Sequence, residues 1–118
     1  MLSRRQEYFL DCAREIAAMS QERKRHGCVV VKNGNVVGLG FNKFRNNPDN
    51  VTEAQIKKNC SYHAEVVALR QAGTNARGAI LFVARLNSNG LDMLSRPCDN
   101  CIVAIEMAGI KKVIFTKG

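Results

Sequence analysis

Four residues whose side chains bind metals or move protons occupy two short motifs of this sequence. His63 precedes Glu65 by two positions, and Cys98 and Cys101 form a Cys-x-x-Cys pair directly after Pro97. One imidazole and two thiolates are ligands that zinc prefers, and three protein ligands leave the fourth position of a catalytic zinc open for water. The spacing predicts a Zn²⁺ site made by His63, Cys98 and Cys101, with Glu65 beside it as the residue that carries protons.

The two motifs stand where helices are expected to begin. Cys98 and Cys101 occupy positions i and i+3, so a single helix directs both sulfurs to one metal. His63 and Glu65 would diverge inside a helix, but in a first turn both side chains reach the space beyond the helix end. The positive charge of a helix N-terminus also favours thiolate over thiol. We therefore expect the metal to lie against the N-termini of two helices.

A purely structural zinc is the alternative use of such ligands. It normally requires a fourth protein ligand, and Cys60, three residues before His63, is the nearest one. We expect Cys60 to be a packed thiol on the approach to the site, and Cys12 and Cys28 to be core cysteines. A zinc-stabilised binding protein without turnover would have no use for Glu65, so this interpretation ranks below an enzyme.

The hydrophobic pattern predicts the order α–β–β–α–β–α–β for the elements that position these motifs. The expected elements are a helix over 3–20, a hairpin over 28–41 that turns at Asn33-Gly34, a helix over 62–72 capped by Ser61 and closed by Gly73, a strand over 79–84, a helix that Pro97 opens and Gly109 ends, and a strand over 111–116. The polar residues 43–60 predict a long loop. Strand–helix–strand units with apolar strands predict an α/β domain with a mixed sheet and helices on its faces.

Composition predicts one soluble domain, residues 1–118, in the cytoplasm. No apolar run approaches the ~20 residues that cross a bilayer, and the N-terminal region reads as an amphipathic helix rather than a signal peptide. The chain has five cysteines, an odd number, and one Cys-x-x-Cys pair, which favours metal chemistry over disulfides. Eighteen Lys and Arg against ten Asp and Glu give a net charge of +8, which favours anionic partners and equally serves solubility.

The segments HAEVVAL (63–69) and PCDNC (97–101) resemble the H-x-E…P-C-x-x-C signature of the cytidine and deoxycytidylate deaminase superfamily. The resemblance implies a three-layer α/β/α cytidine deaminase-like core with a mixed sheet, here truncated after the fourth strand. It also implies that zinc-bound hydroxide attacks C4 of cytosine or C6 of adenine, with Glu65 as general acid/base. The backbone N–H groups of Ala64 and Cys98 would contact the water or the developing charge.

The tripeptide Gly40-Phe41-Asn42 adds a second resemblance. Relatives that act on deoxycytidylate or tRNA adenosine end their second strand in Gly-aromatic-Asn, and that Asn binds the sugar. The resemblance implies this role for Asn42, with Phe41 beside it. Three cations flank the same rim and suit either a phosphate or a solvated basic edge: Lys43, Arg45 and Arg96.

These features predict deamination of cytosine to uracil in a nucleotide-type substrate (dCMP, CMP or the nucleoside), with release of ammonia. HAEVVALRQAG resembles the tRNA adenosine deaminase branch, but Arg96 stands where that branch usually carries Glu. The sequence also stops at Gly118, before the C-terminal elements with which relatives grip large substrates. Deamination of adenosine or cytosine in single-stranded nucleic acid or tRNA is therefore the alternative. An exposed final strand further predicts a homo-oligomer.

Overall fold

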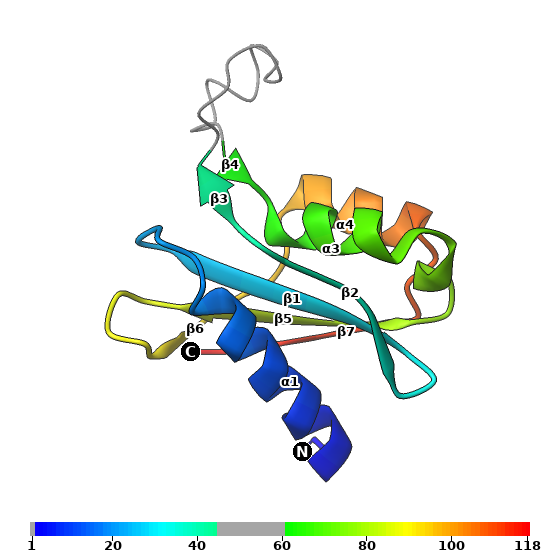
Figure 1. Ribbon diagram of the computed structural model, residues 1–118, viewed down its shortest axis with the longest axis horizontal. Coiled ribbons are helices and arrows are strands. Elements are labelled where there is room, and N and C mark those ends of the chain that lie inside the picture. Colours follow the sequence, from blue (N-terminus) through cyan, green and yellow to red (C-terminus); the bar gives the residue numbers. More distant parts are fainter. Residues whose placement is uncertain (1, 45–60) are drawn as a thin grey trace.

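A five-stranded mixed sheet forms the centre of the molecule in the computed structural model, which describes residues 2–44 and 61–118 (Figure 1). The strand order is β2-β1-β5-β6, and β7 pairs with β5. The strands are β1 (Arg25–Lys32), β2 (Asn35–Phe41), β5 (Ile80–Leu86), β6 (Asp92–Met93) and β7 (Lys112–Phe115). The β5–β7 pair is parallel and the other pairs of this sheet are antiparallel, which confirms the predicted mixed sheet.

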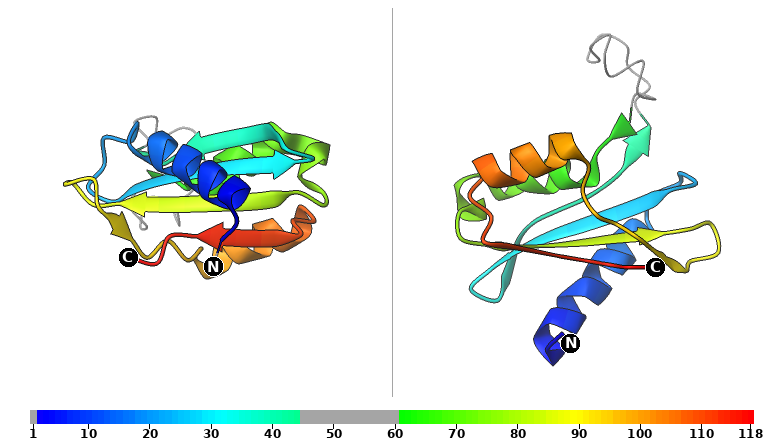
Figure 2. Two further views of the ribbon diagram at one scale, coloured as in Figure 1. Left: turned by 90° about the horizontal axis from the view of Figure 1, so that it is seen from below. Right: turned by 180° about the vertical axis from the view of Figure 1, so that it is seen from behind.

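Helices cover both faces of the sheet and produce the predicted α/β/α layers. Helix α1 (Arg4–Ala17) lies on one face, whereas α3 (Ala64–Ala72) and α4 (Asp99–Met107) lie on the other, as both views of Figure 2 show. A short 3₁₀ helix, η2 (Gly73–Ala76), follows α3. Within the described ranges, no helix is both long and apolar enough to cross a membrane.

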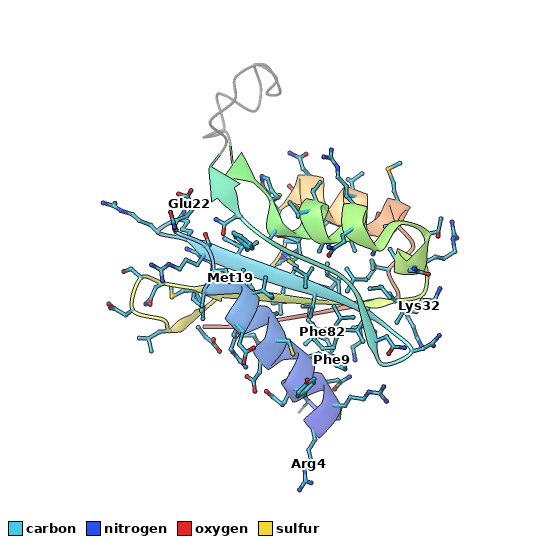
Figure 3. All side chains as sticks on the ribbon, viewed as in Figure 1. Arg4, Phe9, Met19, Glu22, Lys32 and Phe82 are labelled. Carbon is cyan, nitrogen blue, oxygen red and sulfur yellow. The ribbon has the colours of Figure 1, made fainter. Side chains whose placement is uncertain are left out.

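Side-chain alternation along β1 divides the hydrophobic core between the two faces. Cys28 and Val30 pack on the side of α3, while Val29 and Val31 pack on the side of α1, because successive strand residues point to opposite faces. On the α1 side the rings of Phe9 and Phe82 lie 5.6 Å apart between their centroids (Figure 3). Residues that share a strand with Cys28 and differ from it by two positions therefore face α3 and α4.

Two sequence signals produce the expected local structure at the start of the chain. Ser3 caps α1, and Ser3 and Gln6 form a capping box. The turn between β1 and β2 has positive φ at Asn33 (53°) and Gly34 (81°), as the primed turns that match strand twist require. The observed α1 ends at Ala17, three residues before the predicted end.

Helix α3 lies unusually close to β2 because two glycines face it. A Cβ atom on Gly40 would stand 2.7 Å from the carbonyl oxygen of Ala64 and 2.8 Å from the nitrogen of Ala68. A Cβ atom on Gly38 would stand 2.3 Å from the carbonyl oxygen of Ala68. The glycines thus bring the first turn of α3, which follows His63, directly onto the sheet.

The start of α3 differs from the prediction. The N-cap is His63 and not Ser61, and the helix begins at Ala64. Ser61 instead belongs to β4 (Ser61–Tyr62), which pairs with β3 (Lys43–Phe44) in a small second sheet. This pairing holds Ser61 in extended backbone too far upstream to cap the helix. The rest of the predicted 43–60 loop, including Arg45 and Cys60, lies outside the described residues.

The start of α4 differs by a similar margin. Pro97 was expected as the first helical residue, but the helix begins at Asp99 with Cys98 as its N-cap. Its inward face is also only partly buried: Ile105 is buried, whereas Ile102 and Ala108 are half-buried, because α4 lies over the sheet edge formed by β7. As predicted, Gly109 ends this helix with a φ of 80°.

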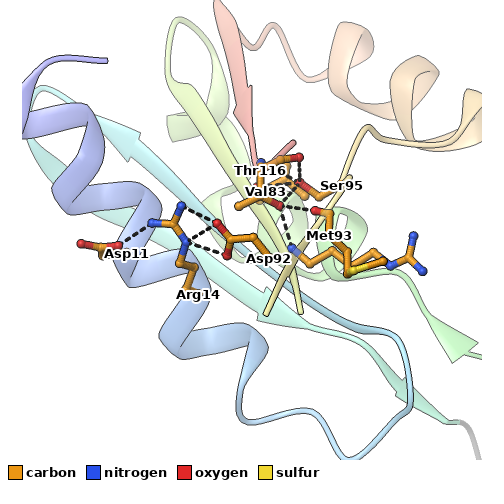
Figure 4. A network of polar contacts seen from close by, with 8 residues as sticks. Asp11, Arg14, Val83, Asp92, Met93, Ser95 and Thr116 are labelled. Atoms are coloured by element: carbon orange, nitrogen blue, oxygen red, sulfur yellow. Dashed lines mark hydrogen bonds and ion pairs between the residues drawn. The ribbon is translucent and has the colours of Figure 1, made fainter. Parts of the chain in front are cut away.

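The sequence did not predict β6 or the polar network that follows it (Figure 4). The guanidinium of Arg14 on α1 pairs with the carboxylate of Asp92 at 2.8 Å. The hydroxyl of Ser95 donates to the carbonyl oxygen of Val83 at 2.9 Å, and that of Thr116 donates to the carbonyl oxygen of Met93 at 2.6 Å. These contacts hold the segment that leads into Cys98 against the sheet.

Candidate metal centre

The three predicted zinc ligands meet at one point of the structure. Nδ1 of His63 lies 3.3 Å from Sγ of Cys101 and 3.8 Å from Sγ of Cys98. All three ligand atoms lie within 4.8 Å of one another. Among residues 2–44 and 61–118, no other three His, Cys, Asp or Glu side chains gather in this way.

The spacing of these atoms fits a tetrahedral zinc ion. Zn–S bonds of about 2.3 Å and Zn–N bonds of about 2.0–2.1 Å place tetrahedral ligand atoms about 3.6–3.8 Å apart. The separations of 3.3 and 3.8 Å match this within a few tenths of an ångström. The donor set therefore fits zinc in its chemistry and in its two N–S separations, and leaves one coordination position without a ligand among the described residues.

Both helix starts contribute a ligand from the N-cap position. His63 and Cys98 have extended backbones, and neither side chain makes a capping hydrogen bond. Their side chains therefore remain available to a metal, while the N–H groups of each first turn have no partner within the helix. Cys101 projects from the first turn of α4, so two helix N-termini converge on the site as predicted.

Glu65 lies in the interior beside this group. It is the second residue of α3, its exposed fraction is 4%, and Oε1 lies 3.7 Å from Sγ of Cys28 on β1. The close approach of α3 at Gly40 positions this carboxylate against the sheet. A buried carboxylate next to three candidate metal ligands is the arrangement expected of a proton carrier.

Burial and negative charge keep two of the thiols protonated in the absence of a metal. Burial, followed by the Glu65 carboxylate, raises the pKa of Cys28. Burial, Glu65 and Cys98 raise the pKa of Cys101 as well. A metal that binds Cys101 must therefore displace a proton, so its affinity increases with pH.

Asn42, predicted to contact a sugar, lies just after β2 and contacts the start of β1. Its Oδ1 accepts a hydrogen bond from the backbone N–H of His26 at 2.8 Å, and its Nδ2 donates to the carbonyl oxygen of Lys24 at 2.6 Å. The hydroxyl of Ser20 also donates to its backbone oxygen at 3.0 Å. These bonds fix the orientation of the amide, which has a second N–H donor.

The other predicted contact residues surround the same end of the sheet. Phe41 is half-buried at the end of β2 and pairs with Gly27. Ala64 is buried as the first residue of α3. Arg96 is exposed, two residues before Cys98. Their roles in substrate binding remain predictions.

The sequence did not predict that three polar residues lie on the sheet face that carries the site. Cys28 is buried as predicted, but its thiol contacts Glu65 as well as the core. His26 and Arg85 share the face of Cys28 by strand alternation, and burial lowers the pKa of His26 while Glu65 opposes that shift. The sequence signal for His26 and Cys28 was the alternation of residues along 26–30, which places them on one face of the sheet. That this face lies under α3 is known only from the structure.

The chain matches a known family over almost its whole length. Residues 3–117 match the model of the cytidine and deoxycytidylate deaminase zinc-binding region. The riboflavin biosynthesis protein RibD of Aquifex aeolicus is 36% identical over 94 residues, which cover 75% of this chain and 20% of that protein. Human deoxycytidylate deaminase is 31% identical over 121 aligned residues, which cover 92% of this chain and 62% of that enzyme. This chain thus spans about a fifth of that RibD protein.

Solved structures show the same likeness. The dCMP deaminase of cyanophage S-TIM5 superposes with a TM-score of 0.72 at 26% identity, over 98% of this chain and 84% of that one. That protein has also been solved in complex with dCMP and dUMP. With the family match over residues 3–117 and the convergence of His63, Cys98 and Cys101, this chain belongs to the cytidine and deoxycytidylate deaminase family.

Proposed function

We propose that this chain is a zinc-dependent hydrolytic deaminase that converts cytosine to uracil in a nucleotide-type substrate. The observation that carries the proposal is the convergence of His63, Cys98 and Cys101 beside the buried carboxylate of Glu65. Three ligands from two helix starts, with a proton carrier two residues after one of them, suit catalysis better than structural stabilisation. A structural site would gain nothing from burying Glu65.

Zinc, when bound by these three residues, supplies a polarised water at neutral pH. The carboxylate of Glu65 would accept a proton from the attacking water while the water oxygen bonds to the ring carbon that carries the amine. Glu65 then gives a proton to the ring nitrogen and assists the departure of the amine. The ring loses NH₃ and gains a carbonyl oxygen, so one water is consumed for each ammonia released. The N–H groups of Ala64 and Cys98 are the proposed donors to the developing charge.

A cytosine nucleotide, dCMP or CMP, is the proposed substrate. The likeness to a dCMP deaminase over 98% of this chain supports it, as does the net charge of +8. Asn42 would use its second amide N–H for the sugar, with Phe41 beside it. Arg96 lies exposed near Cys98 and would meet the phosphate.

Deamination of an amino-pyrimidine nucleotide is the second candidate, because a Buchnera aphidicola protein named diaminohydroxyphosphoribosylamino-pyrimidine deaminase is 32% identical over 76% of this chain. The 36% identity to the Aquifex protein exceeds the 31% identity to the human enzyme, and both reactions would use the same ligands and Glu65. Adenosine or cytosine in single-stranded nucleic acid or tRNA is a further alternative from the sequence. Binding of oligonucleotides with a steep salt dependence would favour that alternative.

A cytoplasmic homo-oligomer is the proposed form of the protein. The outer edge of β7 pairs with no further strand among the described residues between Lys112 and Phe115, and such an edge favours association. Sedimentation of the zinc-loaded protein would measure this.

A screen for ammonia release tests the reaction and its substrate together. Zinc-loaded protein is incubated with cytosine, cytidine, CMP, dCMP, adenosine, an amino-pyrimidine nucleotide and single-stranded oligonucleotides. We expect release from dCMP or CMP, and a decrease of about 10²–10⁴-fold or more in Glu65→Gln. Glu65→Gln must keep its zinc, measured by atomic absorption. Near-normal turnover in that variant would overturn the role of Glu65, and release from adenosine alone would overturn the substrate.

A further inference from the structure

His26 and Arg85 form a polar pair on the sheet face that carries the metal centre. In the antiparallel β1–β5 pair, Cys28 lies opposite Val83 and His26 lies opposite Arg85. Cys28 and Val83 belong to the core under α3 and α4. Residues two positions away share that face, so His26 and Arg85 continue it beyond the core.

The intervening residues of each strand, Gly27 and Ala84, face the opposite side of the sheet, as this alternation requires. Gly27 faces α1, since a Cβ atom there would stand 2.2 Å from the backbone nitrogen of Ala17. Ala84 likewise packs in the core beneath α1. The pair lies one step of two residues, about 7 Å, further from the core than Cys28 and Val83. His26 still interacts electrostatically with the site, because Glu65 raises its pKa and His63 lowers it.

The guanidinium of Arg85 has few partners in the fold. Its Nη1 makes one long hydrogen bond, 3.4 Å, to the carbonyl oxygen of Leu94. Its Nε is buried and has no acceptor among the described residues. The salt bridges of the described ranges are those of Arg14, so no carboxylate there neutralises Arg85. Buried donors are normally satisfied, and a half-buried cation normally has a counter-charge.

We propose that Arg85 binds the phosphate group of the substrate, an inference that rests on the proposed deamination of a nucleotide. A guanidinium offers two parallel N–H donors to phosphate oxygens, which is the geometry that phosphate recognition favours. The ligand would bring the missing counter-charge to the terminal nitrogens of this guanidinium.

Position favours the phosphate over the base as the partner of Arg85. The reacting ring must lie at the metal ligands and Glu65, above Cys28. Arg85 lies one strand step beyond that level, and its bond to Leu94 directs the guanidinium toward the segment that precedes Arg96. Groups attached to the ring extend away from the reacting carbon, so they, and not the ring, reach this distance. Arg96 would add a second, exposed positive charge to the same subsite.

His26 suits a place between the ring and the phosphate. Burial, with Arg85, His63 and Lys24 adding to it against Glu65, lowers its pKa, so the imidazole is neutral near pH 7. A neutral ring does not repel Arg85 and does not compete with it for the phosphate. We therefore expect His26 to line the space between the ring and the phosphate. Arg85 should be the residue that makes a nucleotide bind more tightly than the nucleoside.

Binding of an unreactive ligand pair tests the subsite apart from turnover. Calorimetry on the zinc-loaded protein compares dUMP with deoxyuridine, which differ only in the phosphate. We expect the wild-type protein to bind dUMP more tightly by about tenfold or more, as a charge-assisted contact provides. Arg85→Gln should remove this preference and leave deoxyuridine binding unchanged, while Arg70→Gln, on the exposed face of α3, should preserve it.

A measurement without substitution covers the case in which Arg85→Gln fails to fold. The Nε–H resonance of Arg85 should shift on addition of dUMP or inorganic phosphate, and not on addition of deoxyuridine. An unmoved resonance, or an equal loss of dUMP and deoxyuridine binding in Arg85→Gln, would overturn the proposal. Failure of the deamination proposal has a different signature: ammonia release would then be absent in the wild-type protein, whatever the dUMP preference.

Discussion

The thiol of Cys28 lies 3.7 Å from Oε1 of Glu65, and both side chains are buried. The raised pKa of Cys28 keeps this thiol protonated, so its S–H donates to the carboxylate. The contact joins β1 to the first turn of α3. It therefore orients the Glu65 carboxylate from the side of the sheet.

Removal of this donor should impair the reaction without removal of the metal. We expect Cys28→Ala to lower kcat about three- to tenfold, equivalent to about 1 kcal/mol for one weak hydrogen bond. Cys28→Ser should retain most of kcat because its hydroxyl still donates. Rates across pH and zinc content are the measurements, with Cys12→Ser on α1 as control. A Cys28→Ala enzyme with unchanged kcat and pH profile would show that the contact only packs the core.

Zinc should stabilise the fold through Cys98. A ligand present at about 1,000 times its Kd stabilises the folded state by about 4 kcal/mol, and this site joins the starts of α3 and α4. We expect a chelator to lower the Tm of the wild-type protein and to leave that of Cys98→Ala unchanged. Cys12→Ala should respond to chelation as the wild type does. Stoichiometric zinc in purified Cys98→Ala would refute the ligand assignment.

A methyl group at Gly40 should displace helix α3. The Cβ atom of Gly40→Ala would stand 2.7–2.8 Å from backbone atoms of α3, which cannot move as a side chain can. Overpacking of this kind costs about 1–3 kcal/mol, and the shift would carry His63 and Glu65 with it. Urea unfolding and ammonia release should both decline. Val36→Ala, at an exposed position of the same strand, should change neither, and an unaffected Gly40→Ala would show that α3 is not held by this contact.

Acid should destabilise the protein partly through His26. Burial, opposed by Glu65 and reinforced by Arg85, lowers its folded-state pKa below the usual 6.5. The contribution of neutral His26 to the free energy of unfolding is therefore complete above pH 6.5. It decreases as the pH falls toward the folded-state pKa. The slope is at most about 1.4 kcal/mol per pH unit.

The difference between wild type and His26→Gln isolates this effect, because zinc loss at low pH affects both proteins. Urea unfolding from pH 7.5 to 5.5, at equal zinc, should show the wild-type advantage shrinking as the pH falls. An advantage that is constant across this range would contradict the assigned shift.

The ligand set and the fold class followed from local signals. Spacing and helix-start signals identified His63, Cys98, Cys101 and Glu65, because motif residues three or fewer positions apart are positioned by their own backbone. Alternation and turn signals likewise identified the hairpin at Asn33-Gly34 and the order of the long elements.

Only the tertiary structure decided which residues surround that group. Ser61 was predicted to cap α3, but it pairs with Phe44 and has an extended backbone. Cys28 and Arg85 lie 37 and 20 residues from Glu65 in the sequence, so no local pattern links them. Their approach depends on strand register and on how closely α3 lies against Gly40. The sequence by itself determined which residues could bind a metal and carry protons, whereas the residues that surround them on the sheet depended on long-range packing.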